Sequence, residues 1–193
     1  MRIARELKPH HLVQRISESD LAGYIHEMGS AIALDYADMD VTFLSIWFGA
    51  KQFNNLSNKV VSSSQRRPKS IVNERIRVRS YGPNTVSNGA PEIVIWPNNP
   101  EKNFRHKDVL IKDDIADTKL TLARTVIPYV MSYEPNSLTV ATMLTKTSHY
   151  DIEASNVDIK YHGPNIDFFA LGTGLDVNEY YRNLKGIWEL IWD

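Results

Sequence analysis

Apolar residues occur along this chain in two patterns, one with helical spacing and one as short continuous runs. In SDLAGYIHEMGSAIALDY, residues 19–36, they recur every three or four positions behind Ser19, which can cap a helix N-terminus. The run VTFLSIWFGA, residues 41–50, is nearly continuous and rich in β-branched and aromatic residues, which is typical of a buried strand. Helical spacing returns in residues 51–61. This part is therefore predicted to be helix, strand, glycine turn and helix.

The rest of the chain continues the alternation. Residues 62–70 and 97–107 are polar and predict exposed connections. Residues 109–112 predict a strand that ends in a turn, after which a helix begins near Leu120 and is limited or kinked near Pro128. The remaining predicted elements are strands over residues 75–82, 92–96, 137–146, 157–163 and 167–172, and a closing helix over residues 176–184.

Strands that alternate with helices predict an α/β fold, with a mostly parallel twisted sheet and helices on both faces. The 193 residues, 42% of them hydrophobic, are enough for one domain with a sizeable core. A net charge of -1 argues against a protein that coats nucleic acid or an anionic membrane. The chain has no cysteine, no apolar signal-peptide core at its N-terminus and no apolar run of ~20 residues. A cytoplasmic location is the simplest prediction.

Three carboxylates stand together in VLIKDDIADTKLTL, residues 109–122, where a strand is predicted to end. In open α/β sheets ligands bind outside the carboxyl ends of the strands. Asp113, Asp114 and Asp117 could there hold a divalent cation, accept hydrogen bonds from a sugar diol, or act as a general base. After them come two hydroxyl side chains and the start of a helix, where backbone N–H groups are free. Such groups can bind a phosphate. Alternatively the aspartates only cap that helix, although three of them would repel each other without a ligand.

Four ordered segments resemble the hypoxanthine-guanine branch of the type I phosphoribosyltransferases. VLIKDDIADTKLTL is similar to the signature that binds 5-phosphoribosyl 1-pyrophosphate (PRPP), and SYG at residues 80–82 to the start of the catalytic flexible loop. TMLTK, residues 142–146, resembles the strand with the purine-reading lysine. FFALGTGLDVNEYYRNL, residues 168–184, resembles the C-terminal segment that contacts the purine and the pyrophosphate. Together they cover roughly residues 20 to 190.

The resemblance implies a role for each matching residue. Asp113 and Asp114 would bind the ribose hydroxyls, and Asp117 would take the proton from purine N7. The 5′-phosphate would be held by residues of one loop: Thr118, Lys119, Leu120 and Thr121. The other implied roles are pyrophosphate binding by Phe48, Gly49 and Arg182, loop closure by Ser80 and Tyr81, purine binding by Lys146, Phe169 and Ala170, and proximity of Asp176, Asp113 and Asp114 to Mg²⁺.

The implied activity is transfer of a phosphoribosyl group from PRPP to a 6-oxopurine such as hypoxanthine, guanine or xanthine, giving a nucleoside 5′-monophosphate and pyrophosphate in purine salvage. The alternative is a catalytically weak or inactive protein on the same fold that senses a nucleotide or PRPP. The resemblance also implies one domain over residues 1–193, with a core over about 20–150. A small hood would form from about 151–193 and N-terminal residues. A homodimer or homotetramer is expected, without nucleic acid or membrane partners.

Two positions depart from the family pattern. Phe48 stands where the pyrophosphate loop usually has lysine or another polar residue, and the family's non-proline cis peptide would map to Trp47–Phe48. Gly49 remains, and backbone amides can bind pyrophosphate without a charged side chain. Lys119 replaces a glycine, so a positive φ there would carry a steric cost, which the lysine could partly offset by pairing with the phosphate. None of the six histidines is assigned a role.

Overall fold

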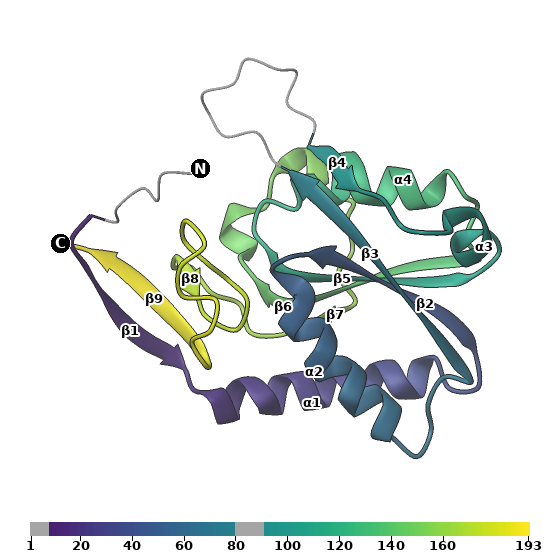
Figure 1. The fold of residues 1–193 in the computed structure, drawn as a ribbon, viewed down its shortest axis with the longest axis horizontal. Helices are drawn as coiled ribbons and strands as arrows, with labels where there is room; N and C mark the ends of the chain where they lie inside the picture. Colours follow the sequence, from purple (N-terminus) through teal and green to yellow (C-terminus); the bar gives the residue numbers. More distant parts are fainter. Residues whose placement is uncertain (1–7, 80–90) are drawn as a thin grey trace.

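The structure is a computed structural model that describes residues 8–79 and 91–193. It contains a six-stranded sheet and a separate three-stranded sheet (Figure 1). Within the described residues, no helix is both long enough and apolar enough to cross a bilayer.

The six-stranded sheet is parallel except at one edge, where the first of its strands runs antiparallel to the second. Ser45 lies opposite Lys112 and Ala116 opposite Thr145, so neighbouring strands end at the same edge of the sheet. This edge is where an open α/β sheet binds its ligand. The strands in spatial order are β4 (Glu92–Ile95), β3 (Ser70–Arg79), β2 (Asp40–Trp47), β5 (Asp108–Ala116), β6 (Ser137–Thr145) and β7 (Tyr161–His162).

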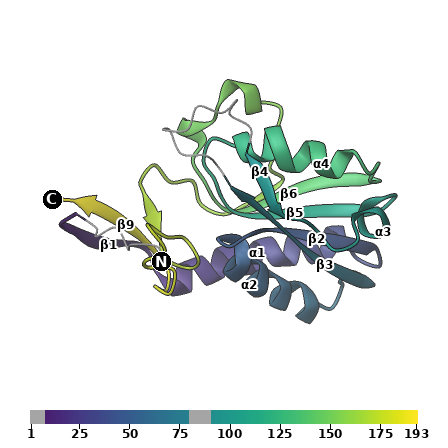
Figure 2. The same ribbon diagram turned by 45° about the horizontal axis from the view of Figure 1, so that its top comes forward.

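Helices cover both faces of this sheet, as predicted (Figure 2). On one face, α1 (Glu18–Asp35) and α2 (Ala50–Ser63) bury their apolar residues in a core with β2 and β6. On the other face, α3 (Pro100–Phe104), the π-helical turn η1 (Leu122–Val126) and α4 (Ile127–Met131) share a second core with β3 and β5. Two short 3₁₀ turns, η2 (Thr147–His149) and η3 (Ile152–Ala154), follow β6.

The small sheet joins the two ends of the chain. Its antiparallel strands are β1 (His10–Ile16), β9 (Ile187–Trp192) and β8 (Ala170–Leu171). Figure 1 shows it on the side toward which β2 and β3 point. The predicted strand over residues 167–172 is thus reduced to two residues. β1 and β9 were not predicted, because each forms a strand mainly by pairing with the other, and they lie near opposite ends of the sequence.

Several predicted boundaries were wrong. The N-cap of α1 is Ser17 and not Ser19, since the Ser17 side chain accepts a hydrogen bond from the Asp20 backbone N–H at 3.1 Å. β3 begins at Ser70, within the predicted loop, because it pairs with β2 from Asp40 onward. The polar connection over residues 97–107 contains α3, which buries Phe104.

Two corrections concern the predicted site. β5 continues to Ala116 because its pairing with β6 extends to Thr145, so Asp113 and Asp114 lie within the strand and not in a turn after it. Residues 176–184 do not form the predicted closing helix. Asn178, Glu179 and Tyr181 have positive φ, which a right-handed helix excludes. The segment folds instead as consecutive turns.

The helix after the aspartates continues past Pro128, and the chain widens into η1 just before this proline.

Lys112 is an unusual core residue because its side chain is fully buried between β5 and α2. Its ammonium donates to Ser57 Oγ at 3.0 Å and to Asn58 Oδ1 at 2.6 Å, and it lies 4.0 Å from the centroid of the Phe43 ring. Both hydrogen-bond acceptors are neutral. Burial therefore lowers the pKa of Lys112 well below its ordinary value.

We expect Lys112→Met to raise the free energy of unfolding at pH 7 by about 1–2 kcal/mol, because it removes a buried ionisable group without a charged partner. The unfolded chain binds a proton that the folded lysine tends to give up, so wild-type stability rises as the pH approaches 10.5. The advantage of the variant should therefore shrink between pH 7 and 10 in denaturant titrations. Lys59→Met, at an exposed position of α2, is the control. An advantage that does not change with pH would contradict this account.

Candidate active site at the carboxyl ends of the strands

Three segments meet in close contact at the carboxyl end of β5. A Cβ atom at Gly49 would overlap Asp114 Oδ2, and one at Gly174 would overlap the Gly49 carbonyl oxygen. Gly174 also has φ +103°, a conformation that side-chain-bearing residues rarely adopt. The backbone of the turn between β2 and α2 therefore packs against the carboxylate at the end of β5. The turn at residues 172–174 packs against the backbone of the same β2–α2 turn.

Phe48 lies at this meeting point but contributes no charge. The Trp47–Phe48 peptide is cis, as the resemblance implied. The Phe48 ring is 43% exposed and stacks on Trp47 with centroids 5.5 Å apart. On Phe48 lies the guanidinium of Arg77 in β3, 4.5 Å from the ring centroid. A cation therefore stands beside the loop, although it comes from the neighbouring strand.

Asp113 and Asp114 form a pair of carboxylates, of which Asp113 is buried and Asp114 half-buried. Their oxygens accept short local bonds: the Asp114 N–H donates to Asp113 Oδ1 and the Ile115 N–H to Asp114 Oδ1, both at 3.0 Å. Burial raises the pKa of both carboxyls, and for Asp113 the charge of Asp114 raises it further. The pair would thus be stabilised by a ligand that brings hydroxyl donors or positive charge.

Arg182 and Asp176 are held together next to this pair. Arg182 Nη2 lies 2.6 Å from Asp176 Oδ1, and Nη1 donates to the Gly174 carbonyl at 2.7 Å. The second oxygen of Asp176 accepts from the Glu179 N–H at 2.7 Å. The charge of Arg182 opposes, but does not outweigh, the effect of burial on the pKa of Asp114. Arg182 is thus placed near Asp114 by its own turn and by Asp176.

The predicted phosphate loop has the expected backbone but an unexpected lysine. Lys119 has φ +63°, as its place in the motif suggested. Its side chain is buried, and Nζ donates to the Val157 carbonyl at 2.9 Å and lies 4.2 Å from the Tyr150 ring centroid. Burial lowers the pKa of Lys119. The ammonium is thus anchored to residue 157, and the pairing of Lys119 with a phosphate stays a prediction. Thr118 is exposed, and Leu120 and Thr121 start the helix.

Asp117 lies between two basic side chains. Lys146 Nζ is 3.5 Å from Asp117 Oδ2, and His149 Nδ1 is 2.9 Å from Asp117 Oδ1. Lys146 is buried at the end of β6, where its N–H donates to the Ala116 carbonyl at 2.9 Å. The structure thus brings Asp117 and Lys146 together. Sequence reasoning missed His149, since it belongs to no histidine motif and only its position three residues after Lys146 links it to the site.

Phe169 and Ala170 come from the small sheet. Ala170 is buried in the same core as Met143 and Leu144 of β6, which sets the small sheet against the strand that carries Lys146. The Phe169 side chain is 49% exposed and is therefore available to a planar ligand. The flexible-loop residues Ser80 and Tyr81 lie outside the described residues.

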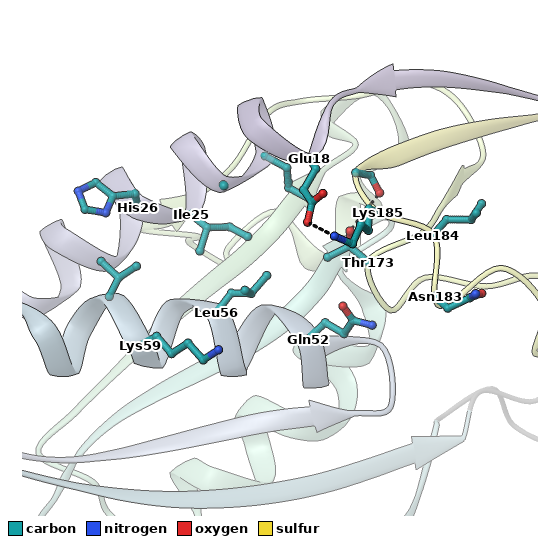
Figure 3. A pocket seen from close by; sticks show the side chains of 14 residues that line it. Glu18, Ile25, His26, Gln52, Leu56, Lys59, Thr173, Asn183, Leu184 and Lys185 are labelled. Carbon is teal, nitrogen blue, oxygen red and sulfur yellow. Dashed lines mark hydrogen bonds and ion pairs between the residues drawn. The ribbon is translucent and has the colours of Figure 1, made fainter.

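A separate pocket of about 530 Å³ lies between α1, α2 and residues 173–186. Figure 3 shows the Glu18–Lys185 ion pair, 3.0 Å long, among its lining side chains. None of the residues to which the sequence assigned a role lines it. It borders the site through Gln52, whose amide donates to the Arg182 carbonyl at 3.3 Å. The pocket therefore borders the predicted site residues but does not include them.

Comparisons with known proteins give one family. No protein-family model matches the chain. A curated relative named hypoxanthine-guanine phosphoribosyltransferase, from Staphylococcus epidermidis, is 32% identical over 173 residues, which cover 89% of each chain. A crystal structure of a hypoxanthine phosphoribosyltransferase from Staphylococcus aureus has a TM-score of 0.79 at 28% identity, covering 92% of this chain and 90% of that one.

A variant of hypoxanthine phosphoribosyltransferase from Trypanosoma cruzi, solved with its product IMP, has a TM-score of 0.79 at 25% identity and covers 96% of this chain and 93% of that one. The likeness thus extends over most of both chains in sequence and in fold. It confirms the resemblance read from the four motifs. The chain belongs to the hypoxanthine-guanine phosphoribosyltransferase family.

Proposed function

We propose that this enzyme transfers the 5-phosphoribosyl group of PRPP to a 6-oxopurine and so acts in purine salvage. The observation that carries the proposal is the place of Asp117 at the end of β5. Its carboxylate lies 3.5 Å from the Lys146 ammonium, and the Asp113–Asp114 pair precedes it within β5. A base and a donor for the purine thus stand beside a diol-binding pair.

The ribose and its two phosphorylated ends would occupy the segments that meet there. The carboxylates of Asp113 and Asp114 would accept hydrogen bonds from the ribose hydroxyls. Residues 118–121 would hold the 5′-phosphate with backbone N–H groups at the start of the helix. The N–H of Gly49 and the guanidinium of Arg182 would face the pyrophosphate, whose negative charge grows as the bond to C1′ breaks.

Asp117 and Lys146 would act on the base. As ring nitrogen N9 forms its bond to C1′, the C1′–O bond to pyrophosphate breaks and the purine must lose a proton. Asp117 would take this proton from N7, and Lys146 would turn from Asp117 to donate to the 6-oxo group. Phe169 would stack on the purine, and the Ala170 carbonyl would accept from an exocyclic group.

The residues present fit a magnesium ion that is shared with the substrate. Among the described residues, no three carboxylate or imidazole side chains form a metal cluster. Mg²⁺ usually keeps several waters and binds one or two carboxylates together with substrate phosphates. Asp113 and Asp114 would hold it, and Asp176 would lie beside it. When bound, the ion supplies positive charge to the leaving pyrophosphate.

The regulatory alternative gains no support from the relatives, which are all named as transferases. The partners in the proposal are PRPP, a purine base, a nucleoside monophosphate and pyrophosphate. Closure by Ser80 and Tyr81, a homodimer or homotetramer, and a cytoplasmic location stay predictions.

The direct test measures pyrophosphate release from PRPP and Mg²⁺ with hypoxanthine, guanine, xanthine and adenine, and identifies the nucleotide by mass. We expect product with at least one 6-oxopurine and little with adenine, because Lys146 can donate to a 6-oxo group but would leave a 6-amino group without an acceptor. PRPP binding without product from any base would favour the regulatory alternative.

We expect Asp117→Asn to lower turnover by about 10²–10⁴-fold, because it removes the base while keeping the side-chain volume. PRPP affinity should stay within a few-fold of wild type in a calorimetric titration. Turnover close to wild type would show that another group takes the proton.

We expect Asp113→Asn to weaken PRPP binding while stabilising the free protein by about 1–2 kcal/mol at pH 7. Folding holds a proton on Asp113 that the unfolded chain releases above its ordinary pKa of 3.8, so wild-type stability falls as the pH rises from there. The gain of the variant should therefore grow between pH 4 and 7 in denaturant titrations. Asp117→Asn, a half-exposed carboxylate at the same strand end, is the control. A gain that shrinks with rising pH would contradict the buried-pair account.

A further inference from the structure

His149 contacts the oxygen of Asp117 that Lys146 does not. Lys146 Nζ approaches Oδ2, whereas His149 Nδ1 lies 2.9 Å from Oδ1. Both side chains come from one turn, because Lys146 precedes η2 directly and its carbonyl accepts the His149 N–H at 2.9 Å. A single short segment therefore holds the carboxylate from both sides.

The chemistry of this contact fixes which atom donates. An ionised carboxylate can only accept hydrogen bonds, so His149 carries a proton on Nδ1 and donates it to Oδ1. The bond restrains rotation of the carboxylate and satisfies one of its oxygens. The lone pairs of Oδ2 become available to another donor once Lys146 turns away.

We propose that His149 is a positioning residue that directs Oδ2 of Asp117 toward the purine. This inference rests on the proposed function, in which Asp117 is the base. As N9 bonds to C1′ and pyrophosphate leaves, the electrons of the N7–H bond remain in the ring and the proton goes to Oδ2. The Nδ1–H···Oδ1 bond persists throughout, so His149 itself neither gains nor loses a proton in the step.

The solvent exposure of His149 argues against a role in packing. Its side chain is 47% exposed and that of Asp117 is 49% exposed, so the contact adds little apolar burial to the core. Loss of the imidazole should therefore leave the fold intact. It should act on the rate of the chemical step, because the orientation of the base matters only when the proton moves.

The first experiment measures single-turnover nucleotide formation and PRPP affinity for His149→Ala and His149→Asn. We expect the alanine variant to slow the chemical step about tenfold with unchanged PRPP affinity, as suits the loss of one charge-assisted hydrogen bond. The asparagine variant should recover to within about threefold of wild type, because its amide N–H can reach the place of Nδ1. Ser148→Ala, exposed on the same turn, should match wild type. Equal rates for His149→Ala and wild type, or no recovery with asparagine, would overturn the proposal.

A double variant tests whether His149 acts through Asp117. In an Asp117→Asn background, the additional change His149→Ala should slow the reaction less than twofold, since the base that it positions is already absent. A full tenfold further loss would mean that His149 acts on something else and would overturn the proposal. If Asp117→Asn alone keeps its turnover, the assignment of Asp117 as the base in the proposed function fails. If it loses turnover while His149→Ala does not, only this inference fails.

Discussion

The contact between Gly49 and the Asp114 carboxylate is the constraint on which the rest of the site depends. Because Gly49 has no Cβ, the turn after β2 can approach the end of β5 until its backbone contacts the Asp114 carboxylate. Gly174 extends the contact to the segment that carries Asp176 and Arg182. Three parts of the chain that are distant in sequence thereby lie in contact at the carboxyl end of β5.

The two departures from the family pattern are accommodated by residues elsewhere in the fold. Phe48 removes a possible charge from the pyrophosphate loop, but Arg77 on the adjacent parallel strand places its guanidinium over that ring. Lys119 takes up a left-handed backbone conformation that costs about 1–2 kcal/mol outside glycine. Its bond to the Val157 carbonyl ties the phosphate loop to the segment after β6. This bond anchors the loop to residue 157.

The sequence predicts the features that local patterns determine, and it does not predict those that depend on contacts between distant segments. The mostly parallel sheet, α1 and α2 were predicted correctly, because local periodicity indicates these elements. The order of the site segments came from the resemblance to the family. The closing helix predicted over residues 176–184 was wrong, since the positive φ of Asn178, Glu179 and Tyr181 cannot be recognised from helical spacing. β1 and β9 form only by pairing between the ends of the chain. The direction of the Lys119 side chain and the place of His149 depend on segments that are joined only after folding.

The charges of β5 indicate how a ligand would stabilise this edge of the sheet. Successive side chains of a strand point to opposite faces, so the buried ammonium of Lys112 does not neutralise the adjacent Asp113. Lys112 is instead held by neutral groups of α2, and Asp113 faces the charge of Asp114. Both arrangements cost folding energy in the free protein. For the carboxylates, hydroxyl donors and positive charge arriving with the substrate would remove that cost. The burial and the repulsion that raise the pKa of Asp113 would therefore favour binding of such a ligand.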